Sequence, residues 1–127
     1  MHRALTLGLI AGALAAGCGT GATSGIGPPP PMALLQVVAV DVVVLESFPP
    51  QIVAHVKGKG PEACTVVDAV QQARRGNTIE VTISTARAGE ICAQVVIDIE
   101  HSVRLEGSFA PGEYLLRVNG VERRFRI

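Results

Sequence analysis

Residues 32–127 are dominated by β-branched side chains, with 24 Val and Ile residues against 6 Leu. Branching at Cβ restricts χ1 and suits the pleated surface of a sheet, so this ratio favours strands over helices. Turn-forming Gly, Pro and Asn divide the segment into short runs, which predicts an all-β, antiparallel β-sandwich of seven or eight strands. The expected strands are Gln36–Leu45, Ile52–Lys57, Thr65–Arg74, Thr78–Thr85, Cys92–Ile99, Ser102–Glu106, Glu113–Val118 and Val121–Ile127.

The run from residue 65 to residue 74 also fits a second interpretation. Val66, Val67, Val70 and Ala73 would share one face of a helix that stops at Gly76. We expect a strand, because the alternating run after Gly76-Asn77 requires an antiparallel neighbour. A short helix over 65–74 stays open as the alternative.

The chain begins with features of an export signal. A short positive start, Met1-His2-Arg3, precedes thirteen uncharged, small or apolar residues, Ala4 to Ala16. This run is too short to cross a hydrocarbon core of about 30 Å, which needs roughly twenty residues. It fits a secretory signal helix, and we assign residues 1–17 to a signal peptide.

The end of that signal, Leu14-Ala15-Ala16-Gly17-Cys18, resembles the lipobox of bacterial lipoproteins. The family usually has Leu three residues before the cysteine, where this chain has Ala15. The resemblance implies that the Cys18 thiol receives diacylglycerol and so anchors the protein to a membrane. The alternative is an ordinary signal peptide that leaves Cys18 as an incidental thiol.

Residues 18–33 read as a linker between this anchor and the domain, residues 34–127. Gly, Ser and Thr give the first part too little apolar surface to fold, which predicts disorder. Pro28 to Pro31 favour a stiff polyproline II stretch.

Two cysteines remain within the domain. Cys64 and Cys92 flank the hairpin expected over residues 65–85, and in an exported domain such a pair most simply forms a disulfide. Metal binding is the rival, but two thiolates need further ligands, and His55 and His101 show no ligand spacing to them. We therefore expect no metal and no cofactor.

Six short segments, spread along nearly all of the domain, carry a resemblance to known proteins. They are Glu46-Ser47-Phe48-Pro49-Pro50-Gln51, Ala63-Cys64-Thr65, Gly76-Asn77-Thr78-Ile79, Cys92-Ala93-Gln94, Pro111-Gly112-Glu113-Tyr114 and Val118-Asn119-Gly120-Val121. In these pieces the domain resembles a group of uncharacterised secreted bacterial proteins with an immunoglobulin-like sandwich. The resemblance implies that fold and the Cys64–Cys92 bridge, and it implies no activity.

The first expected strand, Gln36–Leu45, is apolar on both sides. In a half-exposed edge strand, apolar and polar residues should alternate. This strand is therefore either buried on both faces or able to bind another protein. One explanation is a strand that switches between the two sheets. The other is a strand that binds a protein partner by β-augmentation. The alternation places Val38, Val40, Val42 and Val44 on one face and Val37, Ala39, Val43 and Leu45 on the other.

Catalytic signals are few. Eleven basic and eleven acidic residues leave no cationic surplus for nucleic acid. Glu100, His101 and Ser102 are consecutive, so neighbours on a strand would point to opposite faces and form no oriented pair. Since the chain also lacks the common nucleophile, phosphate-loop and metalloprotease motifs, we expect no enzymatic activity.

The C-terminal hairpin allows a register to be predicted. Asn119-Gly120 is a preferred centre of a two-residue turn, which sets Arg117 opposite Glu122 and Glu113 opposite Arg126. We expect these charges to pair across the strands rather than to form an anion site. The same register turns Arg123 toward the core beside Leu116.

Together these features predict a lipid-anchored, extracytoplasmic, non-catalytic interaction or structural module of the cell envelope, in the periplasm or on the cell surface. Its partners would be a membrane, through Cys18, and a protein, through the first strand. The alternative is a small extracytoplasmic inhibitor or ligand-binding domain.

Overall fold

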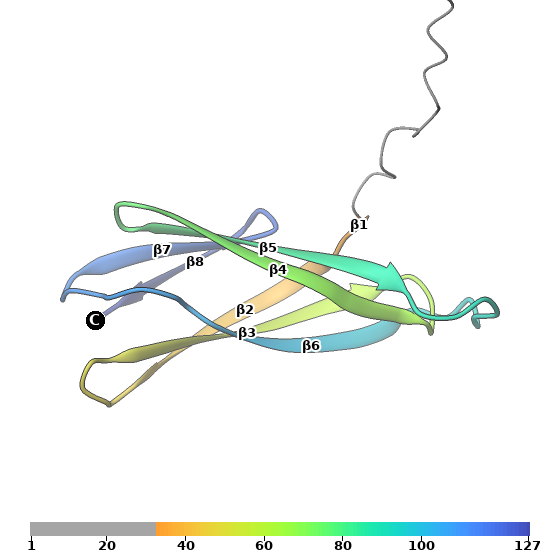
Figure 1. The fold of residues 1–127 in the computed structure, drawn as a ribbon, viewed down its shortest axis with the longest axis horizontal. Coiled ribbons are helices and arrows are strands. Elements are labelled where there is room, and N and C mark those ends of the chain that lie inside the picture. The colour runs from red at the N-terminus through yellow and green to blue at the C-terminus, as the bar shows by residue number, and fades with distance from the viewer. Residues whose placement is uncertain (1–32) are drawn as a thin grey trace, which may run out of the picture.

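The computed structural model describes residues 33–127, which form eight strands and no helix (Figure 1). The expected signal helix over residues 1–17 and most of the linker lie outside the described residues. The strands are β1 (Ala33–Leu34), β2 (Gln36–Leu45), β3 (Gln51–Gly60), β4 (Thr65–Arg75), β5 (Thr78–Arg87), β6 (Ile97–Arg104), β7 (Glu113–Val118) and β8 (Val121–Arg126).

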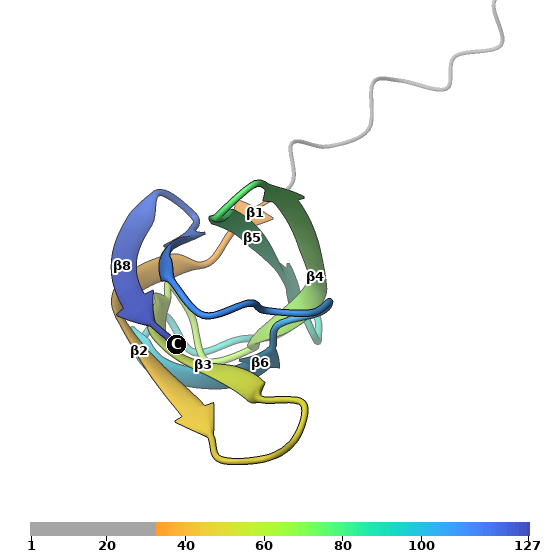
Figure 2. The same ribbon diagram turned by 90° about the vertical axis from the view of Figure 1, so that its left-hand side faces the viewer.

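The strands form two sheets that face each other, as the end-on view in Figure 2 shows. One sheet contains β2, β3 and β6 in that order, and the other contains β1, β4, β5, β7 and β8. In the larger sheet β4 pairs along the whole of β5. The opposite edge of β5 is therefore shared by β7, at residues 78–81, and β1, at residues 84–85. The predicted β-sandwich is confirmed.

One strand pair departs from the expected antiparallel arrangement. β5 and β7 run parallel, with Ile79 opposite Leu116, whereas the other five pairings are antiparallel. The reason is the path of the chain, which leaves β5, crosses to the other sheet as β6 and returns as β7. Such a non-local pairing leaves no mark on the local alternation of residues.

Both predicted hairpins are present. β4 extends from Thr65 to Arg75 as a strand, so the alternative of a helix over 65–74 is wrong. Gly76 occupies the left-handed region at φ +57°, which a glycine adopts without steric cost. In the second hairpin Asn119 and Gly120 have φ of +46° and +88°, as a type I′ turn requires.

β3 continues three residues beyond its predicted end at Lys57, because its glycines are strand residues and not a turn. At Gly58 a Cβ atom would lie 2.8 Å from both the Leu35 side chain and the Gln36 carbonyl oxygen. Leu35 is 2% exposed and lies where the chain crosses from β1 in one sheet to β2 in the other. The chain therefore switches sheets at Leu35, just before the expected strand Gln36–Leu45, which itself stays in the smaller sheet, and Gly58 leaves room for the crossing.

The predicted strands Cys92–Ile99 and Ser102–Glu106 are wrong as two separate elements. Residues 97–104 form the single strand β6, which pairs with β3 throughout. Residues 92–96 lie outside it, because Cys92 is bonded to Cys64 and the Ala93 carbonyl accepts a hydrogen bond from the Ala63 N–H.

The core lies between the two sheets and ends in an aromatic cluster. Phe109, Tyr114 and Phe125 pack with ring centroids 5.3–6.5 Å apart, and the Arg74 guanidinium lies 4.5 Å from the centre of the Phe109 ring. The Tyr114 hydroxyl donates to the Ala110 carbonyl at 2.6 Å. The buried apolar residues are Leu35, Val40, Ile52, Ala54, Val56, Ile79, Val81, Ile83, Val103, Leu105, Phe109, Tyr114, Leu116 and Val118.

Candidate interaction surfaces

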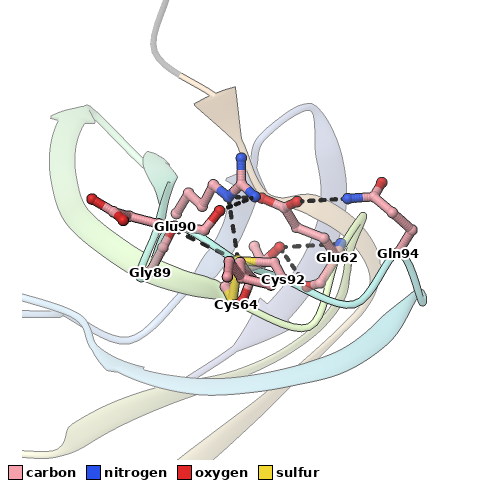
Figure 3. Close-up of polar contacts among 9 residues, drawn as sticks. Glu62, Cys64, Gly89, Glu90, Cys92 and Gln94 are labelled. Atoms are coloured by element: carbon pink, nitrogen blue, oxygen red, sulfur yellow. Dashed lines mark hydrogen bonds and ion pairs between the residues drawn. A yellow bond between two sulfur atoms is a disulfide. The ribbon is translucent and has the colours of Figure 1, made fainter.

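A disulfide closes one end of the sandwich. Cys64 directly precedes β4, Cys92 follows β5, and their sulfur atoms are bonded with the Cα atoms 5.5 Å apart (Figure 3). The predicted bridge is confirmed. A disulfide that closes a loop of this length constrains the unfolded chain, and it stabilises the fold by about 3 kcal/mol.

Arg87 joins the disulfide to its surroundings. Its Nε lies 3.2 Å from a Glu62 carboxylate oxygen and 3.2 Å from Cys92 Sγ, and its Nη2 donates to the Glu90 carbonyl at 3.0 Å (Figure 3). Gln94 Nε2 donates to the other Glu62 oxygen at 3.2 Å. We call residues 88–96 the stapled loop, since the bridge and these contacts hold it at several points.

The stapled loop displays apolar side chains. Ile91 is 97% exposed, Val96 69% and Val95 53%. Isolated apolar residues are common on protein surfaces, but three within six residues of a held loop are typical of an interaction site. The sequence analysis missed this site, because it assigned Val95 and Val96 to the strand Cys92–Ile99 and gave Ile91 no role.

The chain enters the domain at the same end. Ala33 in β1 pairs with Thr85, three residues before the stapled loop begins at Ala88. At a rise of about 3.3 Å per residue, that is a distance of roughly 10 Å along β5. The start of β1 and the stapled loop lie toward the same end of the molecule in Figure 1.

The first strand is arranged differently from the prediction. A bulge between Val37 and Ala39 interrupts the pairing of β2 with β3, so Val38 is 52% exposed while Val40 is buried. The expected common face of Val38, Val40, Val42 and Val44 is therefore wrong for Val38, and the other three pack on the core. Val43 and Leu45 remain partly exposed on the outer face, at 40% and 42%.

A row of polar residues crosses the outer face of the smaller sheet. Asp41 lies opposite His55, and His55 lies opposite Ser102, on three neighbouring strands. His55 Nδ1 is 2.9 Å from Ser102 Oγ. This row also escaped the sequence analysis, because its members are far apart in the chain and only the register of β2, β3 and β6 brings them together.

The row resembles a nucleophile, a base and an acid, but its geometry is incomplete. Within the described residues no hydrogen bond or ion pair joins the Asp41 carboxylate to the His55 ring, so nothing orients the base. Acyl transfer also needs donors aimed at a developing oxyanion. The central strand β3 is paired on both sides, so its N–H groups serve the ladders.

The C-terminal hairpin has the predicted register and the predicted ion pairs. Arg117 lies 2.8 Å from the Glu122 carboxylate, and Arg126 lies 3.9 Å from that of Glu113. The hydrogen bonds that the Arg117 guanidinium donates to Glu122, together with the negative charge of that carboxylate, raise the pKa of Arg117. Arg123 does lie opposite Leu116, but it is exposed, since β8 is an edge strand.

An open groove of about 600 Å³ runs beside this hairpin. Tyr114 and Phe125 form its apolar wall, and Arg124, Arg126 and Glu113 supply charge. Because Arg126 and Glu113 face each other, the groove has no uniform charge that would select an anion.

The family model of the ORF11 beta-sandwich domain matches residues 54–127. The chain belongs to the ORF11 beta-sandwich domain family. An uncharacterised 10.2 kDa protein in the HgiCIIM 5′ region of Herpetosiphon aurantiacus is 30% identical over 94 residues, which cover 73% of this chain and all of that protein. A second, in the HgiBIM 5′ region, is 28% identical over 82 residues, which cover 64% of this chain and all of that protein. No solved structure matches the chain significantly.

The ORF11 match contains most of the surfaces described above. Cys64, the stapled loop and the C-terminal hairpin all lie within it, whereas β2 precedes it. The ORF11 match shows a β-sandwich domain. The names of the Herpetosiphon proteins state no activity.

Two of the expected features concern membranes and metals. Cys18, the expected lipid attachment site, lies outside the described residues. Between residues 33 and 127 no helix is long and apolar enough to span a membrane. The same residues contain no cluster of three or more His, Cys, Asp or Glu side chains that could hold a metal ion.

Proposed function

We propose that this ORF11-domain protein is a lipid-anchored, extracytoplasmic interaction module of the cell envelope, and that it is not an enzyme. The observation that carries the proposal is the Cys64–Cys92 disulfide. Structural disulfides persist in oxidising compartments outside the cytoplasm. This agrees with the signal-like start of the chain and with the lipobox-like sequence that ends at Cys18.

The distribution of exposed apolar residues supports an interaction role. The stapled loop displays Ile91, Val95 and Val96 on a backbone that is fixed by covalent and polar contacts. A fixed loop loses little conformational entropy when it binds, so a small apolar surface can contribute usefully to affinity. β2 adds a second, smaller apolar area through Val38, Val43 and Leu45.

Binding by β-augmentation at β2 receives less support. Most of the valines expected to bind a partner contribute to the core, and β2 lies next to β8 along one side of the sandwich (Figure 2). A partner strand would have to displace β8 to reach the free edge of β2. We therefore assign the interaction role chiefly to the stapled loop.

The anchoring proposal is tested by fractionating cells that express the full chain. The wild-type protein should sediment with membranes and resist washing with salt, whereas Cys18→Ser should appear in the soluble fraction. Thr20→Ala, two residues beyond the cysteine, is the matched control and should stay with the membranes. Membrane retention of washed Cys18→Ser would contradict the anchor.

The second candidate is a small extracytoplasmic ligand-binding or inhibitory domain. The groove beside the C-terminal hairpin favours it, since Tyr114 and Phe125 offer an apolar wall next to Arg124. Saturable shifts of the amide resonances around these three residues, on titration with small uncharged aromatic compounds, would support this candidate. Absence of any shift would remove it.

We also propose a relationship to immunoglobulin-like sandwiches. The hydrogen bond from the Tyr114 hydroxyl to the Ala110 carbonyl has the form of a tyrosine corner, in which a tyrosine near the start of a strand bonds to the backbone a few residues upstream. The parallel β5–β7 pair departs from the all-antiparallel immunoglobulin sheets. An experimental structure, compared strand by strand, would decide the relationship.

A further inference from the structure

Exposed apolar side chains gather near the end of the sandwich where the chain enters. Of the nine large apolar residues that are exposed in the described part, five lie on the stapled loop or opposite residues 84–86 of β5. They are Leu34, Val66, Ile91, Val95 and Val96. Ile91 and Phe48, the two most exposed, lie on loops at opposite ends of the long axis in Figure 1.

The stapled loop holds its apolar side chains outward. Cys92, next to Ile91, is tied to β4 through Cys64, and the Glu90 carbonyl on the other side accepts from Arg87. The Cys64 carbonyl accepts from the Ala88 N–H, which fixes the start of the loop. With its backbone held at these points, the loop cannot fold Ile91 back onto the core without breaking them.

The position of the proposed anchor decides which surface this loop meets first. Fourteen residues separate Cys18 from Ala33, and even a fully extended chain of that length reaches at most about 50 Å. Ala33 pairs with Thr85 close to the loop, so the tether attaches at the loop's end of the domain. A tether of this length gives the loop a high effective concentration at the bilayer, and weak apolar contacts then suffice for binding.

We infer that the stapled loop inserts Ile91, Val95 and Val96 into the interface of the bilayer that carries the lipid anchor. This inference rests on the proposed function, because the tether provides the proximity. The domain would then lie with its disulfide end against the membrane. Its opposite end, with Phe48 and the groove beside the C-terminal hairpin, would face away.

The charges around the loop define which lipid surface it fits. Arg87 and Lys59 are the cations near the loop, and Glu62, Glu90 and Asp98 are the anions, with Lys59 paired to Asp98. A group with this balance gains nothing from a negatively charged membrane. Insertion is therefore driven by apolar side chains, and phosphatidylcholine vesicles without anionic lipid should support it.

The chain contains no tryptophan, so a single Trp substitution provides an unambiguous reporter. The test uses the full-length lipidated protein, reconstituted into phosphatidylcholine vesicles with ordinary or brominated acyl chains. Ile91→Trp reports on the stapled loop. Phe48→Trp is the matched control, because Phe48 is similarly exposed and the β2–β3 loop that carries it lies at the opposite end of the long axis (Figure 1).

The expected result is a shift of the Ile91→Trp emission to shorter wavelength in vesicles, together with quenching by brominated lipid. Phe48→Trp should keep its aqueous emission and should not be quenched. If reconstituted Ile91→Trp behaves like Phe48→Trp, or is quenched only when anionic lipid is added, the insertion is contradicted while the anchor stands. If the protein does not associate with vesicles at all, the anchor fails and the inference fails with it.

Discussion

Asn119 binds both backbone groups of Ile83 through its side chain. Its Oδ1 accepts from the Ile83 N–H at 2.9 Å, and its Nδ2 donates to the Ile83 carbonyl at 2.9 Å and to the Leu35 carbonyl at 2.8 Å. Along this edge of β5, the pairing with β7 ends at Val81, and the pairing with β1 begins at Ser84. The amide of Asn119 therefore fills the gap between two strands that share one edge of β5, while its backbone forms the β7–β8 turn.

We predict that Asn119→Gly lowers the free energy of unfolding by about 2–3 kcal/mol. Glycine accepts the positive φ of this position, so the loss reports on the three side-chain hydrogen bonds, at roughly 1 kcal/mol each. Urea denaturation measures it. Asn77→Gly, which removes one side-chain bond in the other hairpin, should cost about 1 kcal/mol. Equal losses for the two variants would contradict a bridging role for Asn119.

The disulfide should be present in freshly isolated protein and should support the domain. Mass spectrometry without reductant is expected to show the peptides that contain Cys64 and Cys92 joined. The double variant Cys64→Ser, Cys92→Ser should lose about 3 kcal/mol of stability, because the unfolded chain regains the entropy of the open loop. Two free thiols in untreated protein would remove the main support for an oxidising compartment.

The side chain of Gln72 should link the two sheets by hydrogen bonds. Its Nε2 donates to the Arg104 carbonyl at 2.8 Å, and its Oε1 accepts from the Glu106 N–H at 3.0 Å, which joins β4 to the chain leaving β6. Gln72→Ala should cost about 1–2 kcal/mol and speed hydrogen exchange at the Glu106 amide. Gln71→Ala, on the neighbouring exposed residue, should change neither quantity measurably. Unchanged hydrogen exchange at the Glu106 amide in Gln72→Ala would mean that the Gln72 side chain does not stabilise the segment that follows β6.

Ser102 should not react as a catalytic nucleophile. Although its hydroxyl contacts His55, the Asp41 carboxylate does not bind the ring, so the base is not oriented. A fluorophosphonate probe should leave the protein unlabelled under conditions that label a known serine hydrolase. Labelling that is lost in Ser102→Ala would overturn the non-catalytic proposal.

The local elements of this fold could be predicted because short-range chemistry fixes them. Gly76-Asn77 and Asn119-Gly120 demand tight turns, and alternation then sets the register on both sides of each hairpin. The Cys64–Cys92 bridge followed from its position around one of those hairpins.

Features that depend on distant partners could not be predicted in the same way. The parallel β5–β7 pair and the contact between His55 and Ser102 exist because of the order in which strands assemble. The bulge at Val38 removed Val38 from the inward face that Val40, Val42 and Val44 share, and no residue type in that run marks a bulge. Val95 and Val96 of the stapled loop were predicted to lie in a strand, since β-branched composition alone does not show whether a segment has a pairing partner.

The central claim of a lipid-anchored module is tested most directly by the mass of the N-terminal peptide of the mature protein. Protein extracted from membranes of its own cells should yield a first peptide that begins at Cys18 and carries a thioether-linked diacylglycerol. A mature protein that begins elsewhere, or that carries an unmodified Cys18, would contradict the claim.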